Sequence, residues 1–341
     1  MLAKRTGLTI VVTGFLILTS ANSTLVPPLD VPLLVSEADT IALGQITSVT
    51  ARGATTLDLG RGTIPANSFV AELRVDRFLK GAAPSPTLLV HFAVPESPVG
   101  IQRVVVGQYG LFFLSAGQAD FRFTNPFHPT LPSMRGEKVP SGGILDQITE
   151  ILGQVLESPL ASDSDRSRTL AAFGSLRTPV AKDTLHHALN NTSGDAKLDI
   201  ARALVARNDI AGLAPVEHAL LHSTGLPENM ISNLAGSLAG LKDPTSIPTL
   251  RQLLTLQDQR VTRAVAVALR QTRSPGALKP LSTLLTNDDL TARYYAVVGM
   301  GEITAQDPWT PAFDEFRDHE SKYLSYWREW AALNLPKDHS K

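Results

Sequence analysis

The sequence contains no cysteine in 341 residues. This absence excludes disulfide bonds, thiolate nucleophiles, iron–sulfur clusters and cysteine-based zinc sites, so packing alone must hold the folded chain together. A large net charge is also absent, because 31 Lys and Arg residues nearly balance 32 Asp and Glu residues to give −1. A chain with this balance lacks the electrostatic footprint expected of a protein that binds nucleic acid or an anionic membrane.

Sequence motifs of common enzymes are missing as well. The chain has no Gly-rich phosphate loop, no His-Glu-x-x-His and no Gly-x-Ser-x-Gly. Asp163-Ser164-Asp165 begins like a calcium-binding loop, but Arg168 stands where that loop needs glycine and Gly174 where it needs glutamate. We therefore expect no catalytic residues, no metal site and no cofactor.

Residues 1–23 predict a secretory signal peptide. Lys4 and Arg5 form a short positive start, residues 8–18 are mostly apolar, and the Ala-Asn-Ser of residues 21–23 suits cleavage. A retained anchor is the alternative, but a membrane-spanning helix needs about 20 apolar residues and this run is shorter. We expect an exported protein, periplasmic or secreted, with no membrane span after cleavage.

Residues 24–125 predict a small all-β domain. Apolar residues alternate with polar ones between turn-forming Pro, Gly and Ser, and the alternation slips near Gly44, where a bulge fits. Residues 33–38, with Pro32 before them, predict a short helix. About five short strands indicate a barrel or a sandwich, with an OB-like barrel favoured. The expected strands are 40–50, 69–79, 88–94, 104–114 and 118–124.

Two short segments of this domain resemble the β-domain of uncharacterised exported bacterial proteins. They are Phe78 to Gly81, and Gly107 to Gly110 followed by Leu111 to Leu114. The resemblance implies a fold and leaves the role of the domain open. Phe112 and Phe113 are expected in the core, with an exposed ligand platform as the alternative. Residues 126–143 hold four prolines and three glycines and predict an interdomain linker.

Residues 144–335 carry an internal repeat. Leu185, Val216, Leu250 and Leu281 are separated by 31, 34 and 31 residues. A period near 31 with two apolar helical segments per unit predicts stacked helical hairpins. The same spacings relate three further sets of residues: Leu189, Leu220, Leu254 and Leu285; Pro179, Ile210, Pro244 and Pro275; and Phe173, Leu204, Leu238 and Leu269.

The repeated units resemble the HEAT family, especially short bacterial HEAT-like units grouped with phycobilin lyases. The resemblance is carried by residues 243–250 with Leu253 and Leu254, and by residues 261–269, and it extends over about 163–318. It implies an all-α solenoid with a cap at each end. An irregular helix at 144–156 is expected at the start. Acidic residues are expected to cap the first helix of each unit: Asp165, Asp195, Asp258 and Asp288.

An aromatic cluster is expected to seal the last repeat, because terminal repeats need an atypical cap. An exposed docking patch is the alternative for these residues. The cluster comprises Trp309, Tyr323, Tyr326, Trp327 and Trp330.

The resemblance to HEAT-like arrays implies that the second helix of each hairpin lines the concave side. The predicted binding residues are therefore polar residues beside the buried leucines of those helices. A metal at His187 and His218 is disfavoured, because equivalent residues of adjacent repeats should lie about 10 Å apart. The predicted partner-binding residues are His186, His187, Glu217, His218, Arg251 and Gln252.

These features favour an exported, non-catalytic scaffold that binds a protein or peptide partner of unknown identity on the concave face of its solenoid. The missing catalytic motifs and the repeat register are the basis of this hypothesis. A lyase-like or chaperone-like enzyme acting on a client protein is the alternative, since some HEAT-like lyases attach bilins to client cysteines. A purely structural envelope protein is a third possibility.

Overall fold

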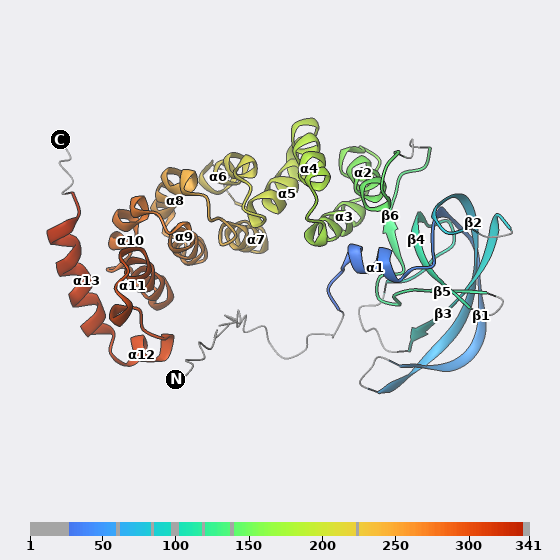
Figure 1. Cartoon of the computed structure of the whole chain (residues 1–341), viewed down its shortest axis with the longest axis horizontal. Coiled ribbons are helices and arrows are strands. Elements are labelled where there is room, and N and C mark those ends of the chain that lie inside the picture. Colours follow the sequence, from blue (N-terminus) through green and yellow to red (C-terminus); the bar gives the residue numbers. More distant parts are fainter. Residues whose placement is uncertain are drawn as a thin grey trace, which may run out of the picture.

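The computed structural model describes residues 27–58, 62–82, 85–96, 102–117, 120–136, 140–222 and 225–336. The predicted signal peptide, residues 1–23, lies outside this part of the chain. A six-stranded mixed sheet is followed by a long run of helices, as the sequence predicts. The helices form an arch that starts at the sheet and ends at the C-terminal helix (Figure 1).

The six strands form one sheet in which the pairings close on themselves. β1 pairs with β2, β2 with β3, β3 with β5, β5 with β4, and β4 again with β1. Among the strand pairs of the described residues, only β3 and β5 run parallel. The ring of pairings therefore describes one continuous sheet rather than two stacked sheets. The strands are β1 (Thr40–Asp58), β2 (Thr63–Lys80), β3 (Thr87–Pro95), β4 (Tyr109–Ala116), β5 (Phe121–Phe123) and β6 (Thr130–Pro132).

The boundaries of the first two strands differ from those expected. β1 and β2 extend well beyond residues 40–50 and 69–79, because they form one long hairpin whose register shifts at several bulges. One shift falls between Leu43 and Gly44, as predicted. A side chain at Gly44 would meet the carbonyl oxygen of Arg74, with its Cβ at 2.3 Å, so only glycine fits there.

β6 was not expected, because it lies inside the proline-rich segment 126–143 that the sequence predicts as a linker. Its three residues pair with β4, and Leu131 is 1% exposed. Pro132, which has no N–H to donate, ends the strand. Part of that segment therefore belongs to the sheet.

The alternation along β4 places Phe112 and Phe113 on opposite faces of the sheet. Phe112 lies in a core that belongs to the sheet domain, together with Ile46 and Leu73. Phe113 lies in a second core that continues into the helices. Both rings are 0% exposed, which confirms that they fill cores and are not a ligand platform.

A short helix, α1 (Val31–Glu37), joins the sheet to the solenoid. It is the helix expected at residues 33–38, with Pro32 in its first turn and Asp30 accepting a hydrogen bond from the Leu33 N–H. Val31 is 0% exposed, and its N–H donates to Ser175 Oγ at 3.0 Å. From the sheet, Lys80 donates to the carbonyl oxygen of Val35 at 2.8 Å.

A second link joins the sheet to α3 (Asp163–Ser175). Arg168 Nη2 donates to the carbonyl oxygen of Thr130 on β6 at 2.7 Å. Burial lowers the pKa of Arg168, although nearby Asp165 opposes this. Since Leu34, Leu131 and Ile148 also belong to one hydrophobic cluster, the sheet and the helices share a core.

The remaining helices form hairpins in the register that the repeat predicts. The first helices of the hairpins are α3, α5 (Gly194–Ala206), α7 (Glu228–Leu238), α9 (Gln259–Thr272) and α11 (Leu290–Thr304). The second helices are α4 (Pro179–Asn191), α6 (Leu213–His222), α8 (Ile247–Leu253) and α10 (Leu278–Leu284). α2 (Ile144–Glu157) precedes them, and α12 (Phe313–Asp318) and α13 (Glu320–Asn334) follow.

Several of the second helices start through a capped turn that contains proline. Pro179, Pro244 and Pro275 occupy first-turn positions, where a missing N–H is harmless. Single-turn 3-10 helices at Ile210–Gly212, Pro244–Ser246 and Pro275–Ala277 lead into α6, α8 and α10. The residues whose side chains cap these turns are Thr178, Asp209, Asp243 and Ser274.

The caps of the first helices match the expectation only in part. Asp258 caps α9 as predicted. Ser162, rather than Asp165, caps α3, and Asp289, rather than Asp288, caps α11. No side-chain hydrogen bond caps α5 at its N-cap, Ser193. For α3 and α11, a neighbouring residue with the extended backbone of an N-cap takes the role.

The side toward which the solenoid curves corrects the expected concave face. Figure 1 shows α7, α9 and α11 along the inner side of the arch and α6, α8 and α10 along the outer side. α5 packs on α7, α7 on α9 and α9 on α11, whereas consecutive second helices approach each other less closely. We call the first helices the inner row and the second helices the outer row.

The composition of the inner row gives the physical reason for this curvature. Alanines at 264, 266 and 268 leave little side-chain volume on α9, and Ala235 does so on α7. Small side chains let helix axes approach more closely, so the array bends toward the row that contains them. The leucine-rich second helices are wider apart and become the outer row.

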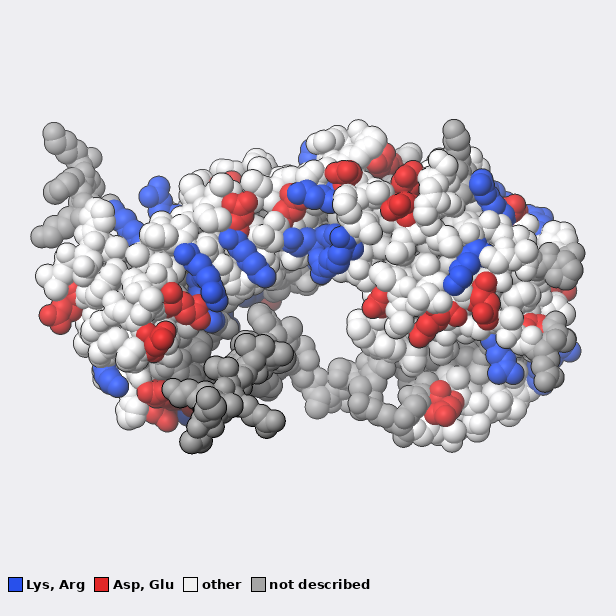
Figure 2. Space-filling view, in the orientation of Figure 1, with Lys and Arg blue, Asp and Glu red and all other residues white. Residues whose placement is uncertain are grey.

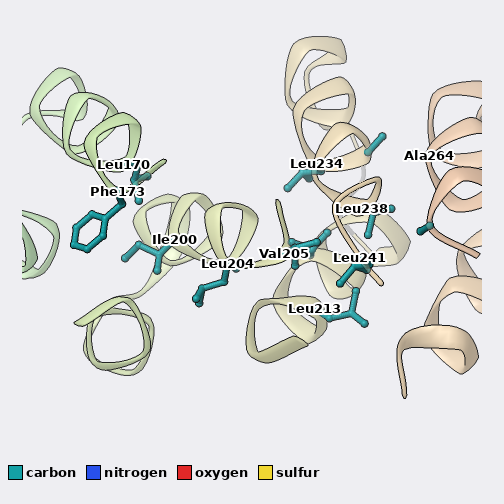
Figure 3. Close-up of a cluster of buried hydrophobic side chains, with 14 of the residues drawn as sticks. Leu170, Phe173, Ile200, Leu204, Val205, Leu213, Leu234, Leu238, Leu241 and Ala264 are labelled. Atoms are coloured by element: carbon teal, nitrogen blue, oxygen red, sulfur yellow. The ribbon is translucent and has the colours of Figure 1, made fainter. Parts of the chain in front are cut away.

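One hydrophobic core runs through the stacked hairpins. In Figure 3, Val205 of α5, Leu213 at the start of α6, and Leu238 and Leu241 at the end of α7 converge between neighbouring hairpins. Each repeat thus buries apolar surface only against its neighbours, as in other solenoids. Among the described residues, no helix has the length and apolarity that a bilayer span requires.

The C-terminal aromatic residues form the expected cap. Trp327 is 0% exposed, and its Nε1 donates to the Trp309 carbonyl oxygen at 3.4 Å. The Trp309 and Tyr326 rings stack at 3.6 Å with planes 3° apart. Burial, with the help of a hydrogen bond to Glu315, raises the pKa of Tyr323 to about 12. These contacts close the last repeat.

Replacing this cap should destabilise the end of the solenoid. Because Trp327 is fully buried, Trp327→Ala should lower the free energy of unfolding by about 3–5 kcal/mol, measured by urea denaturation. Leu333→Ala is the control, since Leu333 is 79% exposed and its loss should cost less than about 0.5 kcal/mol. Equal effects of the two substitutions would contradict the cap.

Candidate functional site

The six predicted binding residues lie on the outer row. His186 and His187 are on α4, Glu217 and His218 on α6, and Arg251 and Gln252 on α8. Because these helices follow the outer side of the arch, the residues do not line its concave side (Figure 1). They fall into separate environments rather than around one centre.

His186 takes part in a polar cluster at the start of the next repeat. Its Nε2 lies 2.8 Å from Asp209 Oδ2, and Lys182 Nζ lies 3.3 Å from the same oxygen. Burial alone would raise the pKa of Asp209, but the Ala211 N–H, His186 and Lys182 outweigh it and hold that pKa below its usual range. Asp209 also caps the following turn through Ala211. The cluster therefore ties α4 to the next hairpin.

His187 has different neighbours although it is adjacent in sequence. Its Nδ1 lies 3.8 Å from Glu157 Oε1 on α2 and 2.6 Å from Asn191 Nδ2 on its own helix. It lines a hollow of about 470 Å³ between α2 and α4, together with Glu150 and Asp183. His187 is thus part of the first hairpin contact and does not share an environment with His218.

The other four predicted residues are more isolated. The rings of His218 and His222 lie 5.0 Å apart on α6. Glu217 is half-buried, and Gln252 is exposed. Arg251 lines a hollow of about 360 Å³ between α8 and α10. Across the described residues, no group of three or more His, Asp or Glu side chains is arranged to hold a metal ion.

The loops between first and second helices form a ladder of contacting turns that was not anticipated. Arg207 donates to the carbonyl oxygens of Phe173 and Leu176 in the preceding turn. Asn208 Oδ1 accepts hydrogen bonds from the backbone N–H groups of Lys242 and Asp243, at 2.5 and 3.1 Å. Each of these turns therefore docks on its neighbour.

Close backbone approach continues this ladder toward the C-terminus. Gly240 packs so tightly that a Cβ there would lie 2.5 Å from the carbonyl oxygen of Ala206. Gln271 Nε2 donates to the carbonyl oxygen of Ala239 at 3.0 Å. We call these loops the turn ladder and define it by residues 176–178, 207–209, 241–243 and 272–274. The sequence indicates that these loops occupy equivalent positions, because they share the spacing of 31, 34 and 31 residues.

Two ion pairs, each with two hydrogen bonds, stabilise the inner row near its end. Arg263 of α9 contacts Asp289 Oδ2 through Nε and Nη2 at 2.9 and 2.5 Å. Arg270 contacts both Glu302 oxygens at 2.9 and 2.5 Å, and this pairing raises the pKa of Arg270. Burial alone would raise the pKa of Asp289, but Arg263 and the Ala292 N–H lower it. These pairs link α9 to the repeat that follows.

The sheet domain has a hollow of its own, of about 430 Å³. Phe92 and Phe123 contribute apolar surface, and His91 and Arg122 contribute polar groups. His91 Nε2 lies 2.9 Å from Asp120 Oδ2. Each of these three hollows is lined by residues of one domain only, so none of them is a site shared by the sheet and the solenoid.

Comparison with known families agrees with this geometry. Residues 226–301 match the HEAT repeats family. That segment covers the helices from α7 to α11 almost completely. These are three helices of the inner row and the two outer-row helices between them. A comparison with curated proteins gave no match. The helical region is therefore a HEAT-like repeat array that follows a small β-sheet domain.

The Asp209 cluster predicts a pH-dependent contribution to stability. Because the folded chain lowers the pKa of Asp209, its contribution is present above about pH 4, the ordinary aspartate range, and is lost as pH falls through the lowered folded pKa. Asp209→Asn should lower the free energy of unfolding at pH 7 by about 1 kcal/mol, because the neutral amide keeps the cap but loses the charged contacts with Lys182 and His186.

Urea denaturation at neutral pH and near pH 3 would check this, with Asp183→Asn as the control. Asp183 is exposed on α4 and faces the hollow toward α2 rather than Asp209, so its substitution should change little. A penalty for Asp209→Asn that stays constant down to the lowest pH would contradict the role of the ionised carboxylate.

Proposed function

We propose that this protein is an exported, non-catalytic scaffold that binds a protein or peptide along the inner row of its solenoid. The observation that carries the proposal is the continuous HEAT-like array, whose inner row presents a long curved surface. HEAT repeats are commonly protein-interaction scaffolds, and stacked repeats expose extended surfaces suited to elongated partners.

The exposed residues of the inner row support binding at this surface. α7 is covered by α5 and α9 on its flanks and by α6 on its outer side, so its exposed side chains face the inside of the arch. Asn229, Ser232 and Asn233 are exposed polar residues on this helix. Half-buried Tyr294 and Tyr295 on α11 add aromatic surface, which interfaces favour.

Photo-crosslinking would test which row binds. A photoreactive residue replacing Ser232 should capture one reproducible partner in cells of the source organism, because Ser232 lies on the inner row. The same residue replacing Gln252 on the outer row is the matched control, since both positions are exposed. The purified partner should then form a stoichiometric complex with the chain in solution.

Capture only at position 252, or a purified pair that does not associate, would contradict the inner-row scaffold.

Export is proposed on the N-terminal sequence alone. Lys4, Arg5 and the apolar run at 8–18 have the order of a signal peptide, and a chain without cysteine needs no oxidative folding outside the cytoplasm. The small residues at 21 and 23 place the cleavage after Ser23.

Mass spectrometry of the protein from its native source would test the cleavage. We expect a mature chain that begins at Thr24, found in the periplasmic or extracellular fraction. Replacing Ala21 with Arg should block processing, because the cleavage site needs small residues, and should leave the precursor uncleaved. An intact N-terminus in a cytoplasmic fraction would contradict export.

A further inference from the structure

The turn ladder carries an unpaired cation at three of its four turns. Arg177, Lys242 and Arg273 occupy equivalent positions, two residues before Pro179, Pro244 and Pro275 respectively. At the remaining turn this position is Asn208, and Arg207 precedes it. Because neighbouring turns contact each other, the three cations follow one another along a single edge of the solenoid.

These three side chains are free to meet a ligand. All three are exposed, and none has an ion-pair partner in the part of the chain that the structure describes. By contrast, Arg263 and Arg270 on the neighbouring helices are neutralised by carboxylates. Figure 2 shows Lys and Arg side chains recurring across the middle of the arch.

Two features of this edge are unfavourable for folding. Arg273 has a φ of 49°, in the left-handed region where a non-glycine residue costs about 1–2 kcal/mol. The equivalent Asn208, with a φ of 62°, is a residue type that adopts this conformation more readily.

Like charges are also held together at the first two turns. Arg177 lies near enough to Arg207 to contribute to the lowered pKa of Arg207, behind the larger effect of burial. Arg177, Lys182 and Arg207 line one hollow of about 400 Å³, with Asp209 as its carboxylate. Mutual repulsion of this kind is relieved when an anionic group binds between the cations.

The spacing favours separated anionic groups over a continuous polyanion. Asp209 and Asp243 lie between the cations along the ladder, and hydrogen bonds hold the pKa of Asp243 low, chiefly that from the Thr245 hydroxyl. A nucleic acid, with one charge per about 1.7 Å of duplex, would place phosphates against these carboxylates. In a peptide, neutral residues can separate the acidic side chains, so that no acidic group lies against Asp209 or Asp243.

We propose that the turn ladder binds an extended, acidic segment of a protein partner through Arg177, Lys242 and Arg273. With helices spaced about 10 Å apart, the ladder spans about 30 Å. An extended segment of about nine residues covers this length, at about 3.3 Å per residue. Because the second turn carries no such cation, the matching acidic residues are expected about six residues apart for Arg177 and Lys242, and about three apart for Lys242 and Arg273. The inference rests on the scaffold function and specifies the chemistry of the partner.

A random 12-residue peptide library displayed on phage, selected against the purified full chain, tests this. Enriched peptides should carry net negative charge. Their affinity, measured by fluorescence anisotropy, should fall as salt rises because the pairs are exposed. The triple variant R177Q/K242Q/R273Q should bind the best acidic peptide about tenfold more weakly, since three exposed ion pairs are lost.

The matched control is R52Q/R77Q/R103Q, which removes the same charge from exposed arginines outside the ladder and should bind as the wild type does. Equal urea midpoints for the two variants would show that both are folded. Full binding by the ladder variant would overturn the inference.

Other outcomes separate this inference from the scaffold function. Enrichment of neutral, apolar or basic peptides would overturn the acidic partner while supporting the scaffold. Tighter binding of duplex DNA or of phosphatidylglycerol vesicles, lost in the ladder variant, would overturn it in favour of a polyanion site. A selection that enriches no peptide also counts against the inference, and the Ser232 crosslinking result then decides the scaffold independently.

Discussion

The close approach of the first helices, made possible by their alanines, determines the shape on which the rest of this molecule depends. Because Ala264, Ala266 and Ala268 leave little volume on α9, its neighbours α7 and α11 pack directly against it. The leucine-rich second helices remain farther apart, and the stack curves away from them (Figure 1). This difference in spacing decides which surface is concave, and so which residues can enclose a partner.

The sheet domain is joined to this arch through a shared core. The apolar cluster that runs through the repeats continues into α1 and the helix-facing side of the sheet, where Ile41, Leu111 and Phe113 are fully buried. Arg168 and Ser175 of α3 add hydrogen bonds to β6 and α1. A buried interface of this kind holds two domains in one orientation more firmly than a flexible linker would. The sheet therefore extends one end of the solenoid.

The sequence predicts the repeats well because each helix buries a face at fixed spacing, so the columns of leucine reveal the register directly. It does not reveal which row is concave, because the first and second helices of the hairpins recur with the same spacing. The spacing therefore does not distinguish the inner row from the outer row. The predicted residues, from His186 to Gln252, consequently fall on the outer row. β6 was missed because three residues between prolines carry no alternation. The turn ladder was missed because it depends on hydrogen bonds to backbone groups of turns about 30 residues apart. The bond from the Lys242 N–H to Asn208 Oδ1 is an example.

Hydroxyl-radical footprinting of the chain with and without its captured partner tests the central claim, that ligands bind along the inner row and its turns. The method reports which side chains lose exposure to solvent on binding. Protection of exposed residues on α7, α9 and α11 and on the turn ladder, with α4, α6, α8 and α10 unchanged, is the predicted result. Protection confined to the outer row, around His187, His218 and Arg251, would contradict it and restore the surface first predicted from the sequence.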